Sequence, residues 1–247
     1  AKKRGSHTLA IVNVVGSSIA NAADDVIYTW AGPEIAVATT KGYSTQLSVL
    51  YLFAVWAARL LKTADGARLD KIFDDILMLP ELTERVILAE PQIKETAKHC
   101  GDPKSLFFIG RNIDYAVSLE ASLKLKEISY IHSEAYAAGE LKHGTISLIE
   151  EGRTVIALAA YEELFDKLLS NIKEVKARGA RVLACATVGH AEIAKEAESV
   201  IYIPKIDPLL LASLEVVPFQ LYAYYVALYN GCDIDKPRNL AKSVTVE

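Results

Sequence analysis

The segment RVLACATVGHAEIAKEAESVIYI, residues 181–203, decides the fold of this chain of 247 residues. It opens with an apolar run at 181–187, continues with a short helical pattern at 191–197 and closes with a second apolar run at 199–203. Two strands joined through a helix by short loops predict a parallel sheet, which is normally covered by helices on both faces. The predicted fold class is therefore α/β.

The same pattern occurs 174 residues earlier in the chain. Groups of residues that recur in the same order at this offset are Arg4-Gly5 and Arg178-Gly179, Leu9-Ala10 and Leu183-Ala184, Ile19-Ala20 and Ile193-Ala194, Ala23 and Ala197, Val26-Ile27-Tyr28 and Val200-Ile201-Tyr202, and Gln46-Leu47 and Gln220-Leu221. An ordered set of matches without gaps indicates a duplicated domain. We therefore expect two tandem domains, each a parallel sheet between two layers of helices.

The first copy is expected to be incomplete, because only Ala1 to Arg4 precede its Gly5. Its predicted elements are strands at 8–14 and 26–30 and helices at 17–23 and 45–61. The predicted elements of the second copy are strands at 105–109, 154–159, 181–187 and 199–203, and helices at 113–130, 161–177, 191–197 and 209–229. The chain is thus expected to begin in the middle of a domain.

Helical patterns fill the region between the two copies. Apolar residues at helical spacing predict one connector helix up to Leu79 and a second after Pro80, and Pro91 is expected to open a third. The expected organisation is a partial first domain at 1–66, connector helices with the complete second domain at 67–231, and a C-terminal tail at 232–247.

Composition excludes several classes of protein. Hydrophobic residues make up 51% of the chain, the net charge is −4 and no basic stripe is present, so a folded protein without a nucleic-acid partner is expected. The three cysteines, Cys100, Cys185 and Cys232, have no CxxC spacing, which favours a reducing cytoplasm and predicts no metal site. The apolar stretches at 47–61 and 209–229 are expected to be buried helices, not membrane spans.

The helix predicted at 113–130 carries three charged residues, Glu120, Lys124 and Glu127, at spacings of four and three. This spacing places them on one face. A solvated row of ion pairs is one interpretation. The alternative is a cluster whose pKa values are tuned by an apolar wall, and the small or apolar neighbours between positions 121 and 125 favour it.

Two further stretches carry a family resemblance. The run KLKEISYIHSEAYAAGELKHG at 124–144 and the C-terminal run PRNLAKSVTVE at 237–247 resemble the glucosamine-6-phosphate synthase family, in its C-terminal sugar isomerase (SIS) region. The resemblance covers the whole chain. It implies tandem SIS domains, a cytoplasmic homodimer without a membrane or a nucleic-acid partner, and conversion of fructose 6-phosphate to glucosamine 6-phosphate with ammonia from a glutaminase domain elsewhere in the full-length chain.

The same resemblance implies roles for individual residues. Lys242 is expected to form a Schiff base with C2 of the sugar, Glu127 to move a proton between C1 and C2, and His143 of the partner subunit to open the ring. Lys124 and Arg238 are expected to stabilise developing charge. Substrate contacts are implied for Val37, Thr39 and Ala241. Thr39 could equally cap a helix, and a tail such as 237–247 is on composition alone a frayed end.

No cofactor is expected, because a lysine imine itself supplies the electron sink. The family's phosphate-binding loop is expected to lie just upstream of Ala1, and the equivalent segment of the second copy, 157–163, is acidic and would repel phosphate. We therefore expect this chain alone to be a poor catalyst. The alternative function is a sugar-phosphate-binding or regulatory SIS module without catalysis.

Overall fold

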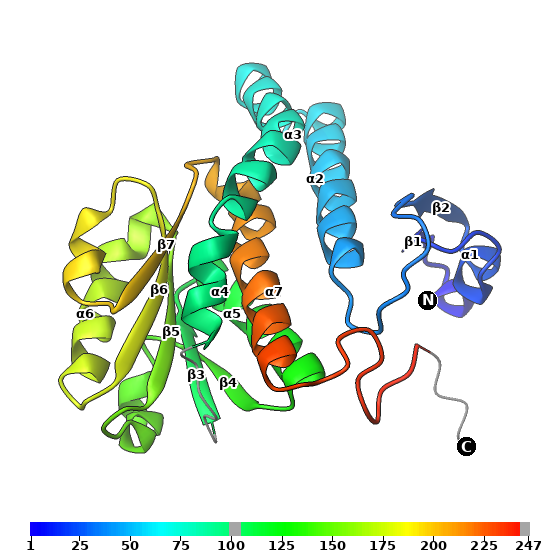
Figure 1. Ribbon diagram of the computed structural model, residues 1–247. Helices are drawn as coiled ribbons and strands as arrows, with labels where there is room; N and C mark the ends of the chain where they lie inside the picture. Colours follow the sequence, from blue (N-terminus) through cyan, green and yellow to red (C-terminus); the bar gives the residue numbers. More distant parts are fainter. Residues whose placement is uncertain (99–104, 243–247) are drawn as a thin grey trace. The chain divides into compact units, whose positions relative to one another are not determined.

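The structure, a computed structural model, describes residues 1–98 and 105–242 (Figure 1). The chain forms two compact units, Ala1–Leu77 and Met78–Glu247. The sequence-based boundary at residue 66 falls at the start of helix α3, Gly66–Ile87, which begins in the first unit and ends in the second.

The first unit contains two parallel strands. Strands β1, Leu9–Val12, and β2, Asp25–Tyr28, pair with Leu9 opposite Asp25 and are joined through helix α1, Ser18–Ala22. Strand β1 is three residues shorter than expected and β2 is one residue shorter. The loop after β2 is fixed by Asn13, whose Oδ1 accepts the Ala31 backbone N–H at 2.9 Å. A short 3₁₀ helix, Lys2–Arg4, precedes β1.

Helix α2, Lys41–Leu61, follows this loop, and one expectation about it is wrong. The apolar stretch at 47–61 was expected to be buried, but Val55 is the single buried residue of α2 among the described residues, and Trp56 is 58% exposed. Two four-residue strands and a one-turn helix offer little surface for a helix of this length to cover. Helix α2 and the helical stretch Pro208–Tyr229 are both long and apolar enough to cross a membrane, by length and composition only.

The connector region departs from expectation at Pro80. Helix α3 runs through this proline, whereas the sequence predicted a break there. A proline removes one helical hydrogen bond, and here the apolar face continues on both sides of it. The buried residues of that face are Leu69, Ile72, Ile76, Leu79, Leu82 and Val86. Helix α4, Glu90–Lys98, begins at Pro91 within one residue, as predicted.

The second unit is a parallel sheet between two helical layers, as the sequence predicted, but the sheet has five strands in place of the four expected. The strand order is β4-β3-β5-β6-β7. The strands are β3 (Ser105–Gly110), β4 (His132–Ala137), β5 (Thr154–Ala159), β6 (Arg181–Thr187) and β7 (Ser199–Ile203). Strand β4, at one edge of the sheet, was not predicted.

Helices cover both faces of this sheet. Figure 1 shows α6 on one face and α4, α5 and α7 on the other. The bounds are α5 (Ile113–Ser129), α6 (Phe165–Lys176) and α7 (Leu211–Tyr229). Short 3₁₀ helices span Leu141–His143, Thr145–Leu148, Glu162–Leu164, Ala191–Lys195 and Pro208–Leu210. The helix predicted at 191–197 is thus a 3₁₀ turn.

Two contacts fix α5 and α7 against the sheet. Phe108 of β3 meets Phe219 of α7 edge to face, with ring centroids 6.0 Å apart. At the end of β3, Gly110 approaches the first turn of α5 so closely that a Cβ atom would lie 2.5 Å from the Asp114 carbonyl oxygen. The β3–α5 junction therefore requires glycine.

An acidic pair is buried in the same layer. Asp114 of α5 is 1% exposed and Glu215 of α7 is fully buried. Asp114 accepts the Tyr161 backbone N–H at 3.0 Å. Burial raises the pKa of Asp114 to about 8, and burial, then the charge of Asp114, raises the pKa of Glu215 well above its usual value. At neutral pH the pair therefore retains a proton.

Candidate active site at the C-terminal end of helix α5

The charged residues predicted on one face of α5 form a compact, largely buried cluster. Lys124 is 4% exposed. Its Nζ lies 2.5 Å from Glu127 Oε2 and 3.6 Å from Glu120 Oε1. The interpretation of this row as a solvated stripe is therefore wrong, because the ammonium group is enclosed and both carboxylates lie against it.

Burial alters the acid–base behaviour of Glu120 in this cluster. It raises the pKa of Glu120, an effect that the positive charge of Lys124 opposes and the negative charge of Glu127 reinforces. Glu127 keeps more exposed side-chain surface than Glu120. A carboxylate at the edge of the cluster, held by an ammonium group behind it, is suited to exchange protons with a bound molecule.

The chain returns to this end of α5 after α7. Helix α7 stops before Gly231, which takes a left-handed conformation at φ 67°. The Asp233 side chain then accepts the backbone N–H groups of Asp235 and Lys236, which closes a turn. Cys232 Sγ lies 3.9 Å from the carbonyl oxygen of Ser129, the last residue of α5.

Arg238 is held at the same place. Its backbone N–H donates to the Tyr130 hydroxyl at 2.7 Å, and its guanidinium carbon lies 4.1 Å from the centroid of the Tyr130 ring. Tyr130 directly follows α5 and lies three residues after Glu127. The structure therefore brings Lys124, Glu127 and Arg238, all predicted from the sequence, to one end of one helix.

Ala241 and Lys242 are exposed and are the last residues described. Lys242 follows Arg238 by four residues, a separation that the backbone can span to about 14 Å at most. The anchored Arg238 thus limits where the Lys242 amine can reach. The rest of the predicted tail, 243–247, lies outside the described residues, as does Cys100.

His143 lies at the other end of the sheet. From the end of α5 the chain enters β4, which rises about 20 Å over six residues. Backbone hydrogen bonds from Ala138 to Gly110, from Glu140 to Ala137 and from His143 to Glu140 then keep the chain beside the carboxyl end of β4. One chain does not bring the exposed His143 to Glu127.

The substrate-contacting residues predicted in the first unit precede α2. Val37 and Thr39 lie in the segment before this helix, and the Thr39 methyl group is the nearest atom to a Cβ placed on Gly42, at 2.8 Å. Thr40, not Thr39, is the N-cap residue, and its hydroxyl accepts no capping hydrogen bond from the described first turn. The capping role considered for Thr39 is therefore wrong.

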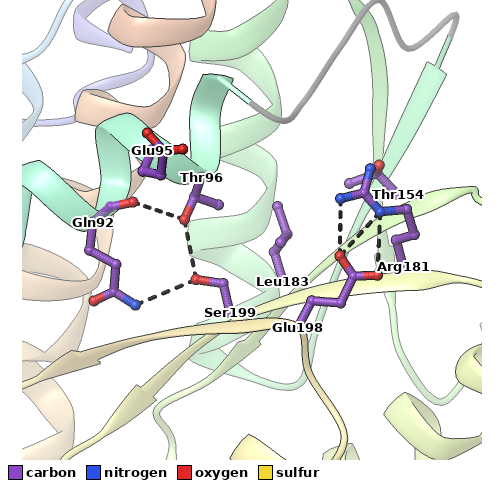
Figure 2. Close-up of a pocket in the computed structure, with 8 residues that line it drawn as sticks. All are labelled: Gln92, Glu95, Thr96, Thr154, Arg181, Leu183, Glu198 and Ser199. Carbon is purple, nitrogen blue, oxygen red and sulfur yellow. Dashed lines mark hydrogen bonds and ion pairs between the residues drawn. The ribbon is translucent and has the colours of Figure 1, made fainter.

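A cavity of about 370 Å³ lies at the amino ends of the second unit's strands (Figure 2). It is lined by Gln92, Glu95, Thr96, Thr154, Arg181, Leu183, Glu198 and Ser199. The polar groups contact one another across it: Gln92 donates to the Val200 carbonyl at 2.8 Å, and Arg181 pairs with Glu198 at 3.0 Å. The first contact attaches α4 to the sheet, and the second joins β6 to the residue before β7. The cavity contains none of the predicted site residues.

The family model for the SIS domain matches residues 1–56 and 101–229. The chain belongs to the SIS-domain family. One matched range lies in the first unit and the other in the second unit.

Relatives of the SIS chain carry a consistent name. A glutamine–fructose-6-phosphate aminotransferase [isomerizing] from Clostridium tetani is 55% identical over all 247 residues, and one from Thermococcus kodakarensis is 47% identical. The C-terminal domain of glucosamine-fructose-6-phosphate aminotransferase from Francisella tularensis matches with a TM-score of 0.88 and 32% identity, covering 93% of this chain and 65% of that one. These matches confirm the resemblance inferred from the motifs.

The SIS chain spans about two fifths of the length of these curated relatives, 41% in both named cases. A solved glucosamine-6-phosphate deaminase from Thermotoga maritima is also similar, with a TM-score of 0.73 and 26% identity over 98% of this chain and 68% of that one. The fold is thus shared by proteins whose names describe different reactions on related sugars.

Sequence reasoning missed one residue of this site, Tyr130. It lies inside the quoted motif, but no role followed from the motif itself. Its partner Arg238 is 108 residues away along the chain, so no local spacing could have indicated the contact. The available signal was a bulky aromatic residue directly after a helix, where glycine is usual.

Proposed function

We propose that this SIS chain is the isomerase part of a glutamine–fructose-6-phosphate aminotransferase, which produces glucosamine 6-phosphate. The observation that carries the proposal is the buried Lys124–Glu127 pair, onto whose helix end the tail bearing Lys242 folds back. A module that only binds a sugar phosphate needs neither a base nor an imine-forming lysine. The naming of the relatives supports the same reaction.

In this proposal the Lys242 amine attacks C2 of the open-chain ketose and water leaves, which gives an imine. Ammonia, supplied by a glutaminase domain of the full-length chain, adds to C2 of this imine and the Lys242 amine leaves, so that C2 keeps an imine of ammonia. This second imine draws electron density from C1, and Glu127 takes the acidic C1 proton while the imine nitrogen gains a proton, which gives an enolamine. Glu127 then returns its proton to C2, and the C1 hydroxyl loses its proton as C1 becomes the aldehyde carbonyl.

The other residues have supporting roles. Lys124, which contacts Glu127, holds that carboxylate in place, and it stabilises negative charge on the enediol-like intermediate together with Arg238. Val37, Thr39 and Ala241 contact the substrate. Because His143 is remote from Glu127 in one chain, we assign ring opening to His143 of the partner subunit in a homodimer. The odd cysteine count supports our assignment of this activity to the cytoplasm.

Chemical trapping in the complete protein tests the proposal. Borohydride with fructose 6-phosphate should reduce an imine and label Lys242, as located by peptide mass spectrometry. Lys242→Ala should lose the label and the activity, while Lys236→Ala, a matched change at an exposed tail lysine, should keep both. Labelling at another lysine, or full activity in Lys242→Ala, would contradict the proposal. Sugar binding without any trapping would favour a non-catalytic module.

A further inference from the structure

Tyr130 ends α5 in an unusual backbone conformation. Its φ is 61° and its ψ is 11°, which is the left-handed region, and its N–H caps the helix by donating to the Lys126 carbonyl. Glycine or asparagine normally takes this position, because a bulky side chain is strained there. A tyrosine at this position indicates that its side chain has a function that glycine could not supply.

The side chain holds a single residue of the tail in two ways. The Tyr130 hydroxyl accepts the Arg238 backbone N–H at 2.7 Å, and the Tyr130 ring lies under the Arg238 guanidinium, with its centroid 4.1 Å away. The first contact fixes the main chain and the second fixes the side chain through a cation–π interaction. Together they fix both the position and the direction of the tail at Arg238.

The contact between Tyr130 and Arg238 lies, along the chain, close to two residues that are proposed to react. Glu127 precedes Tyr130 by three residues on a rigid helix, and Lys242 follows Arg238 by four residues. We propose that Tyr130 is a positioning residue that sets the distance between the Lys242 amine and the Glu127 carboxylate. This inference rests on the proposed function of those two residues, and Tyr130 itself touches no reacting atom.

Two substitutions separate positioning from folding. Tyr130→Phe keeps the ring and removes the hydroxyl acceptor. Tyr130→Gly removes both contacts and relieves the left-handed backbone, so the helix cap is kept. Tyr202→Phe, on the partly exposed strand β7, is the matched control. None of the three replaces a proposed catalytic group.

The main measurement is the rate of borohydride trapping at Lys242 in the complete protein with fructose 6-phosphate. Tyr130→Phe should slow trapping about tenfold, as expected for one lost hydrogen bond, and Tyr130→Gly about a hundredfold. The loss should appear in kcat with little change in KM. The second measurement is amide hydrogen exchange of residues 232–242, which should speed up in Tyr130→Gly and not in Tyr202→Phe.

The two measurements distinguish failure of this inference from failure of the proposed function. Unchanged trapping and unchanged tail exchange in Tyr130→Gly would overturn the positioning role while Lys242 remained the imine lysine. If the unmodified protein gave no adduct at Lys242, the proposed function would fail, and so would the claim that Tyr130 serves that reaction. Faster amide exchange in Tyr130→Gly would then show only that Tyr130 orders the tail.

Discussion

Lys124 is the residue whose surroundings say most about the site. It is enclosed between Glu120 and Glu127, and the cluster as a whole carries one more carboxylate than ammonium groups. An ammonium group in this position neutralises charge that would otherwise be left uncompensated next to the core. Lys124 should therefore contribute strongly to the free energy of unfolding, even though its contacts lie within a single helix.

Replacing Lys124 should destabilise the fold. Lys124→Met should lower the free energy of unfolding by about 3 kcal/mol, near the lower end of the range for a broken buried pair because both carboxylates keep some contact with water. Urea unfolding measures this change. Lys126→Met, an exposed change on the same helix, should stay within about 0.5 kcal/mol. Equal effects of the two changes would show that the Lys124 cluster is not enclosed.

The buried pair Asp114 and Glu215 predicts a pH dependence. Both carboxyl groups have a raised pKa in the folded state, so the folded protein holds its protons more tightly than the unfolded chain does. The contribution of this pair to the free energy of unfolding is therefore fully present below the unfolded pKa of about 4. It is lost as the pH rises toward about 8, where the folded Asp114 ionises. Denaturation measured at pH values between these two limits should give a free energy of unfolding that falls as the pH rises. Glu215→Gln, which cannot ionise, should show a smaller fall, and an identical slope would argue against a shared proton.

The sequence predicted part of the site at this scale. Glu120, Lys124 and Glu127 could be grouped because helical spacing places them together and their neighbours are apolar. The contact of Tyr130 with Arg238 joins two segments of the second unit that are 108 residues apart along the chain, and only the folded chain brings them together. The raised pKa values of Asp114 and Glu215 were equally hidden, because each is a single acid within an otherwise ordinary helical pattern.

Helices and strands were predicted correctly where the hydrophobic pattern and the flanking turn residues indicated the same element. Strands β5, β6 and β7 were predicted to the residue, because each is an apolar run between polar or glycine-containing turns. Strand β4, with the sequence HSEAYA, lacks that apolar character because it lies at the sheet edge. Pro80 by itself predicts a helix break, but the apolar spacing continues across it and α3 runs through it. Packing outweighed local preference in both cases.

The close approach of Gly110 to helix α5 predicts how a substitution at the junction between β3 and α5 affects stability. Gly110→Ala should destabilise the second unit by about 2 kcal/mol, because a Cβ atom would clash with the backbone of the first turn of α5 and the helix would have to shift. Gly66→Ala, at the open start of α3, should instead be neutral or stabilising by up to about 1 kcal/mol. Thermal unfolding of both variants checks the difference. Equal losses would indicate a general intolerance to added volume.

At the scale of the whole molecule, the proposed roles of His143 and Glu127 predict a site completed by two chains, because the two residues are separated within one chain. A mixture of Glu127→Gln and His143→Ala subunits should therefore regain activity. Random pairing makes half of the dimers mixed, and each mixed dimer has one intact site out of two, so about a quarter of full activity is expected. Each variant alone is the control and should be nearly inactive. No recovery on mixing would place both residues in one chain's site.

Helix α7 has a consequence for the order in which the protein is made. It follows every described strand, yet it is among the most buried elements and packs against both α4 and α5 on one face of the sheet (Figure 1). Until the ribosome has synthesised residues 211–229, α4 and α5 alone can cover that face of the nascent sheet, and the apolar side chains that α7 will contact remain open to other chains. The second unit must therefore complete its folding late in synthesis, and a chaperone that shields this face should raise the yield of native protein.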